Sequence, residues 1–437
     1  MSDSDVPLRK ILIDLTFLLD QYSGRGIGRY GKEIIRRLLR MILNEGGWEI
    51  HLIGFDDLEK NLYELKYSKL SINEISEKLI FHSLGKAYPS NIKNIFRWDK
   101  TYDKIIDAIS PEIYYAVHFE RGLPSVPRFR KNLVTVPKTV VVAHDVIPLV
   151  FDKYSEKGFI QNYIKKKFYN FMFEGVQKAD LVLTASNFSK NDLITYGKVP
   201  NNRIRTIYLG VDEIFEKDKY DEELSMINAT LERYNLRHRT YLLYDSGLEV
   251  NKGIDGLLSI FKNISDSSKK ELPEFLVVTG SSLTPGVGKE ITGRNNLGKS
   301  FIRKAKKLGV LDNIVAAGFI SDEELVTALM KADGYIYLSD YEGFGFGPIQ
   351  AMKAGIPSIV ANRSCLPEIT DGGAFLVDTT KIEKTSKAII KFLTDEDAKN
   401  EVIKKGEIVS KKYDWDITTK KTWNEIKELC NDNLDNE

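Results

Sequence analysis

The stretch YEGFGFGPIQAMKAG, from Tyr341 to Gly355, places one carboxylate directly before a run of glycines. The apolar GYIYLS before it predicts a buried strand, and Pro348 suits the first turn of the helix that IQAMKA continues. Glycines between a strand and a helix let backbone approach a ligand, and a helix N-terminus attracts anions. A phosphate at that end, with Glu342 accepting hydrogen bonds from hydroxyls, describes a nucleotide-sugar site. A tight glycine turn beside a solvated Glu342 is the alternative that spacing alone leaves open.

The same loop resembles the signature loop of the retaining glycosyltransferases of family four, which have the GT-B fold. Glu342, Gly343, Phe344 and Gly345 match the family's Glu-Gly-Phe-Gly, and GIPSIVANRSCLPEITDGGAFLVD continues as the family does. The resemblance extends over nearly all of the chain and is strongest between residues 314 and 378. It implies an α/β protein with two doubly wound, Rossmann-like domains that face a central cleft.

The resemblance also implies roles for the residues of this loop. Glu342 binds hydroxyls of the donor sugar, together with the backbone of Gly343, Phe344 and Gly345. Pro348 and Ile349, at the start of the helix, take the distal phosphate of the donor. Gln350 stands where the family has a second Glu that holds the ribose hydroxyls, and Gly347 stands where proline is commoner.

The amide at Gln350 has two explanations. An amide can donate to and accept from a hydroxyl, so ribose binding need not be lost, although a charged acceptor is usually the stronger partner. The substitution is then drift without consequence. Alternatively, the donor nucleoside has no ribose 2′-hydroxyl, which points to a thymidine-linked donor. A buried carboxylate without a hydroxyl partner carries a desolvation cost that an amide largely avoids.

Two further segments resemble the N-terminal domain of the family. VVVAHDVIPLVF resembles the end of a strand whose His reaches the donor sugar from across the cleft, which implies that role for His144. A lone His on an apolar run is also consistent with a core histidine whose hydrogen-bonding groups find partners inside the protein. YSGRGIGRYGKEIIRRLL resembles the loop after the first strand, where glycines let backbone pass near donor phosphates and acceptor. Gly26 and Gly28 match it best, and Gly24 fits a simple turn equally well.

DSGLEVNKGID resembles the opening of the nucleotide domain, where a basic pair neutralises the diphosphate. Lys252 matches the lysine of that pair, and Gly247 stands where many members carry arginine. A leaving diphosphate needs electrostatic stabilisation, so we expect Lys252 to provide it together with helix N-termini. The other cations nearby in the sequence, most of which we expect to be solvated, are Arg294, Lys299 and Arg303.

Two acidic motifs have spacings that suit metal binding or helix capping. DED at Asp395–Asp397 follows a Thr and starts a charged helix, and SDEE at Ser321–Glu324 has the spacing of a capping box. We predict caps at both places. Cys365 and Cys430 are too few for a disulfide framework, and no Cys/His cluster has metal-ligand spacing. We therefore predict no metal and no cofactor, with the nucleotide sugar as a substrate.

Two segments, NYIKKKFYNFMF (162–173) and KEIIRRLLRMIL (32–43), combine basic and apolar residues at helical spacing. This pattern is typical of a helix with one core face and one solvated face. It also fits a membrane-surface helix that brings an enzyme to a lipid-linked acceptor. YDWDITTKKTWNEIKEL predicts an amphipathic C-terminal helix with Trp415 and Trp423, which in the family returns to pack on the N-terminal domain.

The whole chain holds 437 residues, of which 42% are hydrophobic and 29% charged, and this suits two globular domains. Lys plus Arg (63) and Asp plus Glu (62) nearly cancel, so the overall charge gives no indication of a nucleic-acid partner. The acidic MSDSDVPLRK does not resemble a signal peptide. No apolar run approaches the roughly 18 residues that span a bilayer. We expect a cytoplasmic protein, with contact to the inner face of the cytoplasmic membrane left open.

Short apolar runs such as KILIDLTFLL, TVVVAHDV, LVLTAS, YLLYDSG and EFLVVTG alternate with helical segments. This predicts parallel sheets with helices on both faces. A charged stretch after Gly210 without a buried strand separates two such series. We expect an N-terminal acceptor domain (1–212), a linker (213–237), a nucleotide-sugar domain (238–410) and a returning C-terminal helix (411–437).

These observations and the resemblance favour a retaining, metal-independent glycosyltransferase. It would move a hexose from a UDP-, GDP- or dTDP-sugar to a glycan or lipid-linked glycan in surface polysaccharide or lipopolysaccharide synthesis. One alternative is a catalytically inactive protein that binds sugar nucleotides or glycans, suggested by Gln350 and the missing arginine. The other is a sugar-nucleotide epimerase on the same fold, which would need acid and base residues that the sequence does not identify.

Overall fold

The computed structural model describes residues 7–16, 26–55, 78–85, 92–117, 134, 136–150, 169–170, 173–219, 236, 239–267 and 269–431. The chain forms two compact units. The N-terminal unit holds Met1–Gly210 and Trp415–Glu437, and the C-terminal unit holds Val211–Asp414. Gly24, most of segment 162–173 and most of the expected linker lie outside the described residues, so the expected domain boundaries stay a prediction.

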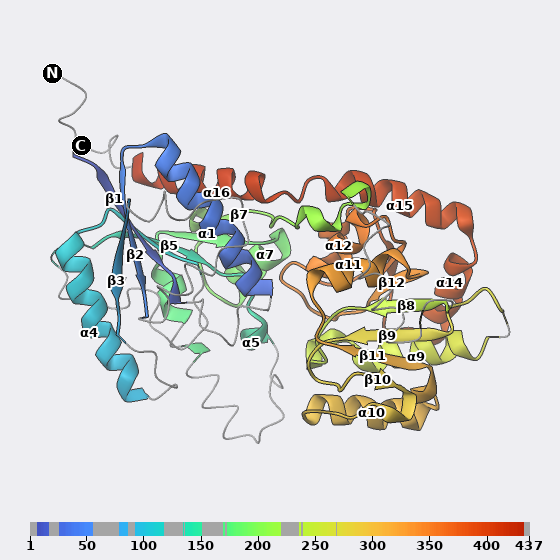
Figure 1. Cartoon of the computed structure of the whole chain (residues 1–437). Helices are drawn as coiled ribbons and strands as arrows, with labels where there is room; N and C mark the ends of the chain where they lie inside the picture. The colour runs from blue at the N-terminus through green and yellow to red at the C-terminus, as the bar shows by residue number, and fades with distance from the viewer. Residues whose placement is uncertain are drawn as a thin grey trace. The chain divides into compact units, whose positions relative to one another are not determined.

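The N-terminal unit contains a seven-stranded parallel sheet with the order β3-β2-β1-β4-β5-β6-β7 (Figure 1). Its strands are β1 (Arg9–Asp14), β2 (Trp48–Gly54), β3 (Leu79–Ser83), β4 (Ile113–Ala116), β5 (Lys138–Val142), β6 (Leu181–Thr184) and β7 (Ile204–Thr206). Its helices are α1 (Gly26–Glu45), α4 (Ile92–Ile109), α5 (Ile147–Val150), η2 (Asn201–Arg203), α7 (Asn187–Thr195) and α16 (Trp415–Asn431). The chain runs outward from β1 to β3 and then continues with β4 on the other side of β1.

Helices cover both faces of this sheet. Alternate residues of a strand point to opposite faces. Asp14 of β1 accepts a hydrogen bond from Tyr102 of α4, at 2.8 Å. On the other face Trp48, which pairs in register with Arg9, stacks edge-on against Trp423 of α16, with 5.2 Å between ring centroids. This places α4 and α16 on opposite faces, as the doubly wound prediction requires.

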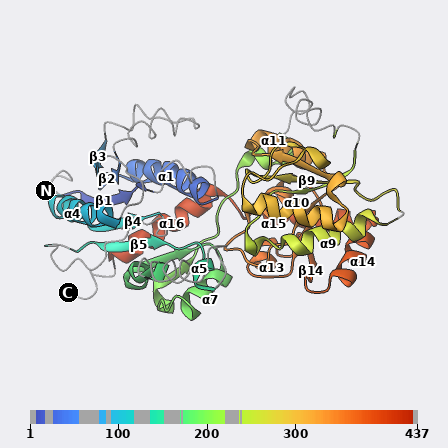
Figure 2. The same ribbon diagram turned by 90° about the horizontal axis from the view of Figure 1, so that it is seen from below.

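The last helix of the chain packs on the first. α16 lies beside α1 in both ribbon views (Figures 1 and 2). Trp423 donates through Nε1 to Glu45 at 2.7 Å, and Arg37 bonds Asp416 at 2.8 Å. The prediction that the C-terminal helix returns to the N-terminal domain is confirmed.

The helix predicted from KEIIRRLLRMIL is confirmed, because this segment lies within α1, and its apolar residues are in the core. Tyr30, Ile34, Ile35, Leu38 and Ile42 are each at most 2% exposed. For α1 the core-face interpretation of this basic and apolar pattern therefore holds. None of the described helices is long and apolar enough to cross a membrane.

The C-terminal unit contains a second seven-stranded sheet, ordered β10-β11-β9-β8-β12-β13-β14. Its strands are β8 (Tyr241–Tyr244), β9 (Phe275–Thr279), β10 (Gly286–Val287), β11 (Ile314–Gly318), β12 (Gly334–Tyr337), β13 (Ser358–Ala361) and β14 (Phe375–Val377). All neighbours are parallel except β10, which runs antiparallel to β11 at the edge. Its longer helices are α9 (Ile254–Ser265), α10 (Asn296–Leu308), α11 (Asp322–Met330), α12 (Phe346–Lys353), α13 (Leu366–Thr370), α14 (Ile382–Leu393) and α15 (Glu396–Ser410). Short turns of 3-10 helix are η3 (Glu213–Phe215), η4 (Lys217–Lys219), η5 (Val250–Lys252), η6 (Gly288–Glu290) and η7 (Leu311–Asn313).

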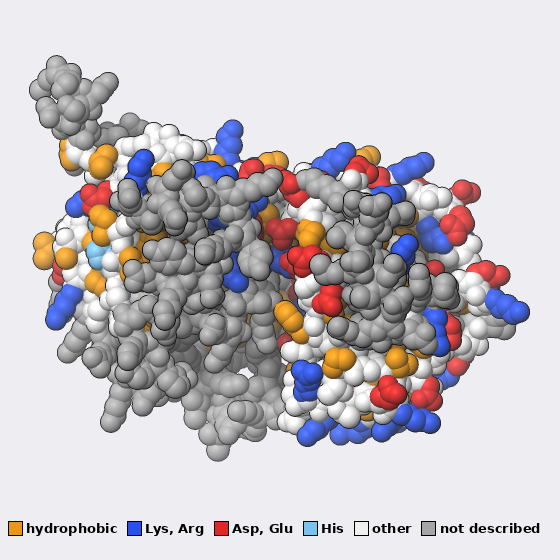
Figure 3. All heavy atoms as spheres, in the orientation of Figure 1, with side chains coloured by type: hydrophobic (Ala, Val, Ile, Leu, Met, Phe, Trp, Pro, Cys, Tyr) orange, Lys and Arg blue, Asp and Glu red, His pale blue; other side chains and the backbone are white. Residues whose placement is uncertain are grey.

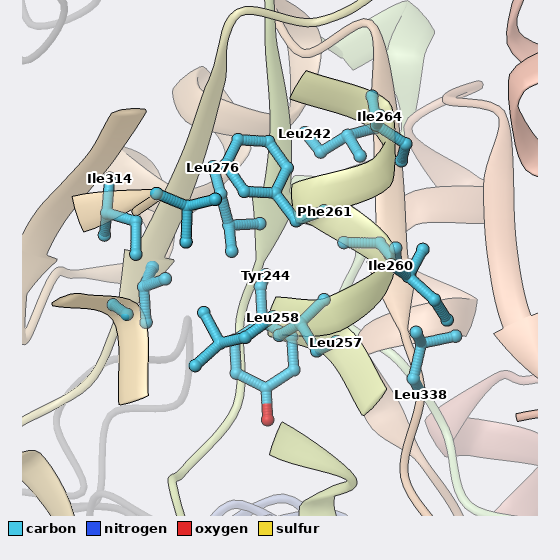
Figure 4. Close-up of a cluster of buried hydrophobic side chains, with 14 of the residues drawn as sticks. Leu242, Tyr244, Leu257, Leu258, Ile260, Phe261, Ile264, Leu276, Ile314 and Leu338 are labelled. Atoms are coloured by element: carbon cyan, nitrogen blue, oxygen red, sulfur yellow. The ribbon is translucent and has the colours of Figure 1, made fainter. Parts of the chain in front are cut away.

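Helix α9 fixes the core beside β8 (Figure 4). Leu257, Phe261 and Ile264 recur at helical spacing and are at most 1% exposed, against Leu242 and Leu276 of the sheet. Each such side chain contributes roughly 1.5–3 kcal/mol by leaving water. The loops at the carboxyl ends of β8 and β12 therefore start from a rigid base.

The structure corrects several expected boundaries. The strand predicted from KILIDLTFLL ends at Asp14, and the one predicted from GYIYLS ends at Tyr337. Gly26 and Gly28 were expected in a loop, but they lie in the first turn of α1. Gly347 was also expected in a loop and is the second residue of α12. Both caps are confirmed: Ser321 and Glu324 form a capping box, and Asp395 caps α15.

Candidate active site

The C-terminal sheet reverses its strand order between β8 and β12. The chain proceeds from β8 to β9 and β11 on one side, then returns to β12 on the other side of β8. Open parallel sheets bind ligands outside the carboxyl ends of strands at such a switch point. The residues that follow these two strands include Lys252 and Glu342.

The backbone after β8 is tied to the backbone after β12. Asn251 is 3% exposed, and its amide donates to the carbonyl of Tyr341 at 2.9 Å. Its own carbonyl accepts from the N–H of Asp340 at 2.8 Å. Gly253 follows with φ 62°, and a Cβ there would collide with the carbonyl oxygen of Leu338. This close approach requires glycine, and it places Lys252 against the second loop.

Glu342 is buried, at 8% exposure, and its carboxylate has two side-chain donors. Lys252 Nζ lies 2.7 Å from Glu342 Oε1, and the hydroxyl of Tyr337 lies 2.8 Å from the same oxygen. The backbone N–H of Glu342 donates to Ser364 Oγ at 3.1 Å. The interpretation of Glu342 as a solvated residue beside a turn is therefore wrong.

The ammonium of Lys252 is paired, with 16% of its side chain exposed against 11% for Glu342. Burial lowers the pKa of Lys252, but the Glu342 carboxylate outweighs burial and the net pKa is raised above the ordinary 10.5. The same two causes, burial and Glu342, raise the pKa of the Tyr337 hydroxyl well above 10.0. At neutral pH Lys252 is thus a cation and Tyr337 a neutral donor.

An acidic side chain lies where the resembled family carries arginine. The carboxylate of Glu249 fills the space that a side chain at Gly247 would need. Tyr244 donates to the carbonyl of Gly247 at 2.9 Å. Glu249 also helps to raise the pKa of Lys252, after the larger contributions of Glu342 and Tyr244. Lys252 is therefore flanked by two carboxylates at this edge of the sheet.

The glycine loop enters α12 through a left-handed residue. Gly345 is the N-cap with φ 87°, and a Cβ there would lie 2.8 Å from Cδ2 of Leu366. At Gly347 a Cβ would collide with the hydroxyl of Tyr335, which explains glycine where proline is commoner in the resembled family. Gly355 follows the C-cap Ala354 with φ 70°, the left-handed conformation that glycine commonly adopts after a helix.

A second loop holds this one in place. Ser364 and Cys365 precede α13, and the thiol of Cys365 donates to the carbonyl of Phe344 at 3.3 Å. With the bond from Glu342 N–H to Ser364 Oγ, this fixes the stretch Glu342–Phe344 at both ends. Ser364 has φ 51°, a left-handed conformation that is uncommon outside glycine.

The remaining predicted donor residues lie in the first turns of α12. Pro348 and Ile349 are buried, and Gln350 is 4% exposed. The free N–H groups of a helix start suit an anion. The more distant cations, Arg294, Lys299 and Arg303, are exposed, as expected. Figure 3 shows basic side chains along the edge where α10 lies, which carries Lys299, Arg303, Lys304, Lys306 and Lys307.

His144 belongs to the N-terminal unit and directly follows Ala143 after β5. It is 8% exposed, and Tyr30 of α1 packs edge-on against its ring with 4.7 Å between centroids. Burial lowers the pKa of His144 to about 4. The imidazole is therefore neutral at physiological pH, and a neutral imidazole can donate one hydrogen bond and accept another. Asp145 accepts from the N–H of Ile147, the first residue of α5, at 2.9 Å.

The structure thus brings Lys252 and Glu342 into direct contact, with the Gly343–Gly345 loop beside them. His144, Gly26 and Gly28 lie in the other unit, and their predicted roles stay predictions. Sequence reasoning missed Tyr337, Ser364 and Glu249. Only Tyr337 carried a signal, as a polar hydroxyl near the end of an apolar strand that must find a partner.

The comparisons with known proteins agree with this architecture. Residues 24–214 match Glycosyltransferase Family 4, and residues 232–409 match Glycosyl transferases group 1. The O-antigen chain mannosyltransferase B of Escherichia coli is 25% identical over 420 residues, 94% of this chain and 97% of that protein. The serotype-specific mannosyltransferase WbdA of Escherichia coli is 23% identical over 93% of this chain, which spans only 46% of WbdA. The structure of Anabaena Alr3699/HepE in complex with UDP-glucose has a similar fold, with a TM-score of 0.67, 15% identity and coverage of 96% and 99% of the two chains.

Proposed function

The chain belongs to the family 4 glycosyltransferases, with a group 1 domain and the GT-B fold, and from this we propose that it is a retaining hexosyltransferase. It transfers the sugar of a nucleotide-sugar donor to a glycan or lipid-linked glycan during synthesis of a surface polysaccharide such as O-antigen. The similarity to two mannosyltransferases, one of them an O-antigen chain mannosyltransferase, supports mannose as the sugar.

One observation carries the proposal. A buried carboxylate, Glu342, stands at the switch point of the sheet directly before the glycine loop that enters α12. A fixed carboxylate can accept hydrogen bonds from sugar hydroxyls, and the following helix start can take a phosphate. A sugar joined to a diphosphate satisfies both groups at once.

We propose the following roles for the side chains and backbone. Glu342 orients the donor sugar, and the N–H groups at the start of α12 stabilise the charge that develops on the leaving diphosphate. Lys252 adds positive charge beside them. In the front-face mechanism proposed for the family, a leaving phosphate oxygen helps to deprotonate the acceptor hydroxyl. His144 then hydrogen-bonds the donor sugar as a neutral imidazole.

The decisive experiment is incubation of the protein with a panel of UDP-, GDP- and dTDP-sugars that includes a mannose donor. Sugar-dependent release of the nucleoside diphosphate, raised by an O-antigen-type glycan acceptor, is the expected result. Analysis of the product's anomeric configuration tests retention. Recovery of an epimerised sugar nucleotide would instead establish the epimerase alternative.

An inactive sugar-nucleotide or glycan-binding protein is the second candidate, favoured by one observation. The carboxylate of Glu249 lies at Gly247, so the diphosphate region gains an anion where the family has a cation. Calorimetric binding of a sugar nucleotide without any nucleotide release across the panel would establish this candidate. Glu342→Ala serves in both cases, because it abolishes turnover in an enzyme and sugar-dependent affinity in a binding protein.

A further inference from the structure

The two side chains that donate hydrogen bonds to Glu342 both donate to the same carboxylate oxygen. Lys252 Nζ and the hydroxyl of Tyr337 lie 2.7 Å and 2.8 Å from Oε1. Among the described residues no hydrogen bond to Oε2 is found. A carboxylate has about four acceptor positions on its two oxygens. Two donors on Oε1 fix the plane of the group and leave the positions on Oε2 for another donor.

The surroundings of Tyr337 hold its ring, and so its hydroxyl, in a fixed position. It is 4% exposed, its ring stacks on Tyr335 with 6.0 Å between centroids, and Lys252 Nζ lies 6.0 Å from its ring centroid. A buried hydroxyl requires partners, and this one donates to Glu342 and also has a hydrogen-bond contact with the side chain of Ser246. Phenylalanine would keep the ring contacts and remove only the hydroxyl.

Ser364 acts on the backbone of the same residue. Its Oγ accepts from the N–H of Glu342 at 3.1 Å, and its own backbone is left-handed with φ 51°. Such strain in a residue with a side chain persists where the surroundings require it, and it gathers at functional sites. Glycine would relieve the strain at this position and lose the hydrogen bond.

We propose that Tyr337 and Ser364 are positioning residues that aim Oε2 of Glu342 at a hydroxyl of the donor sugar. Tyr337 sets the plane of the carboxylate, and Ser364 sets the backbone from which the side chain extends. This inference rests on the proposed function, because it takes Glu342 to contact the donor sugar. It assigns no contact with the substrate to either positioning residue.

The first test is Tyr337→Phe. We expect kcat to fall about tenfold, the effect of losing one hydrogen bond to a charged group. Affinity for the free nucleoside diphosphate should stay within about twofold, because no phosphate contact changes. Tyr241→Phe is the matched control: it removes another buried hydroxyl of the same sheet, which donates to Ala328 at 2.7 Å. Equal kcat losses in the two variants would overturn the proposal.

The second test asks whether Tyr337 acts through Glu342. Calorimetry gives the ratio of sugar-nucleotide affinity to nucleoside-diphosphate affinity, which needs no turnover. Tyr337→Phe should lower this ratio in the wild type and leave it unchanged in a Glu342→Ala background. A further decrease in that background would show an independent, structural role and overturn the inference.

The third test is Ser364→Gly, which separates stability from activity. Relief of the left-handed strain should keep or raise Tm, while loss of the acceptor for Glu342 should lower kcat. If Ser364 had a purely structural role, kcat would fall in this variant only if Tm also fell. Full turnover in Ser364→Gly would remove Ser364 from the proposal.

The variant Glu342→Ala distinguishes a failure of the proposed function from a failure of the positioning inference. If this variant keeps turnover within a few-fold, the proposed function of Glu342 fails. If it loses turnover while Tyr337→Phe and Ser364→Gly match the wild type, only the positioning inference fails.

Discussion

Lys252 and Glu342 lie 90 positions apart in the chain, and their side chains meet with 2.7 Å between Nζ and Oε1. β8 and β12 are neighbours in the sheet although three strands and three α-helices separate them in sequence. Each charged group is mostly removed from water, with 16% and 11% of the side chains exposed. The attraction between the ammonium of Lys252 and the carboxylate of Glu342 therefore offsets the hydration that both groups lose on burial.

Removal of one partner should destabilise the C-terminal unit. Breaking a buried pair leaves an uncompensated charge and costs about 3 kcal/mol in the free energy of unfolding. We expect Lys252→Ala to show this loss in urea unfolding. Lys252→Ala combined with Glu342→Ala should be less destabilised than the sum of the single variants. Additive losses would show that the pair is not coupled.

Lys252 should also affect nucleotide binding. Lys252 is a cation that contacts Glu342, the residue directly before the glycine loop. Its removal should weaken binding of a nucleoside diphosphate by about 1.5–3 kcal/mol, the range for a charge-assisted bond. Isothermal calorimetry on Lys252→Ala gives the value, and Lys299→Ala on the exposed face of α10 is the control. Unchanged affinity would mean that the ammonium of Lys252 pairs with Glu342 and does not contribute to nucleotide binding.

His144 makes the stability of the N-terminal unit depend on pH. Its pKa is about 4 in the folded protein because of burial, against 6.5 as the ordinary value. The unfolded chain therefore binds the proton more readily, and stability is complete above pH 6.5 and falls as pH decreases towards 4. The loss at the acid end is about 3 kcal/mol, at 1.36 kcal/mol for each pKa unit.

Urea unfolding at several pH values checks this prediction. His144→Asn removes the titrating group, so its stability should fall less between neutral and acid pH than that of the wild type. Burial also lowers the pKa of His51 and His82, so a residual decline is expected in both proteins. An identical decline in the two proteins would contradict the assignment.

The sequence predicted features that depend on local spacing. Ser321 with Glu324, and Asp395, cap helices because the necessary atoms lie within one turn of each other. The start of α12 was placed less well. The pattern predicts Gly347 to be a loop residue, whereas its real constraint is the hydroxyl of Tyr335 in β12, the strand that leads into this loop. Such a contact depends on how α12 packs in three dimensions.

The same reason explains what was missed at the site. Lys252 was predicted to face a diphosphate, and its partner in the structure is Glu342. The pairing of Glu342 with Ser364 depends on two loops at adjacent strand ends. A glycine motif can indicate that backbone meets a ligand, but it carries no information on which distant side chain orients the carboxylate.

Gly345 should resist substitution more strongly than an equivalent glycine elsewhere. Gly345→Ala places a side chain at φ 87° and 2.8 Å from Leu366 Cδ2, whereas Gly372→Ala has φ 83° and open space. The left-handed strain alone costs roughly 1–2 kcal/mol and should appear in both variants. We expect a larger decrease of Tm and a loss of transfer activity only in Gly345→Ala. Equal effects would show that the contact with Leu366 is relieved by movement.

The last prediction concerns Gln350, which is 4% exposed on α12. If the donor carries ribose and the amide is drift, a carboxylate at this position should hold the 2′-hydroxyl more strongly. The gain from a neutral to a charge-assisted bond is about 1 kcal/mol, or about fivefold in affinity. Calorimetry with uridine diphosphate and 2′-deoxyuridine diphosphate isolates that hydroxyl, because the two ligands differ nowhere else. The same pair in the guanosine series shows whether the base changes the result.

We expect the wild type to prefer the ribose form and Gln350→Glu to widen that preference. The deoxy ligand serves as the control: it gives a buried carboxylate no hydroxyl partner, so its affinity should fall in Gln350→Glu. A thymidine-linked donor predicts the reverse pattern for the wild type. The protein would then bind the deoxy form at least as tightly as the ribose form, and thymidine diphosphate would compete better than the uridine and guanosine diphosphates. That outcome would make the amide a determinant of donor choice and would exclude drift.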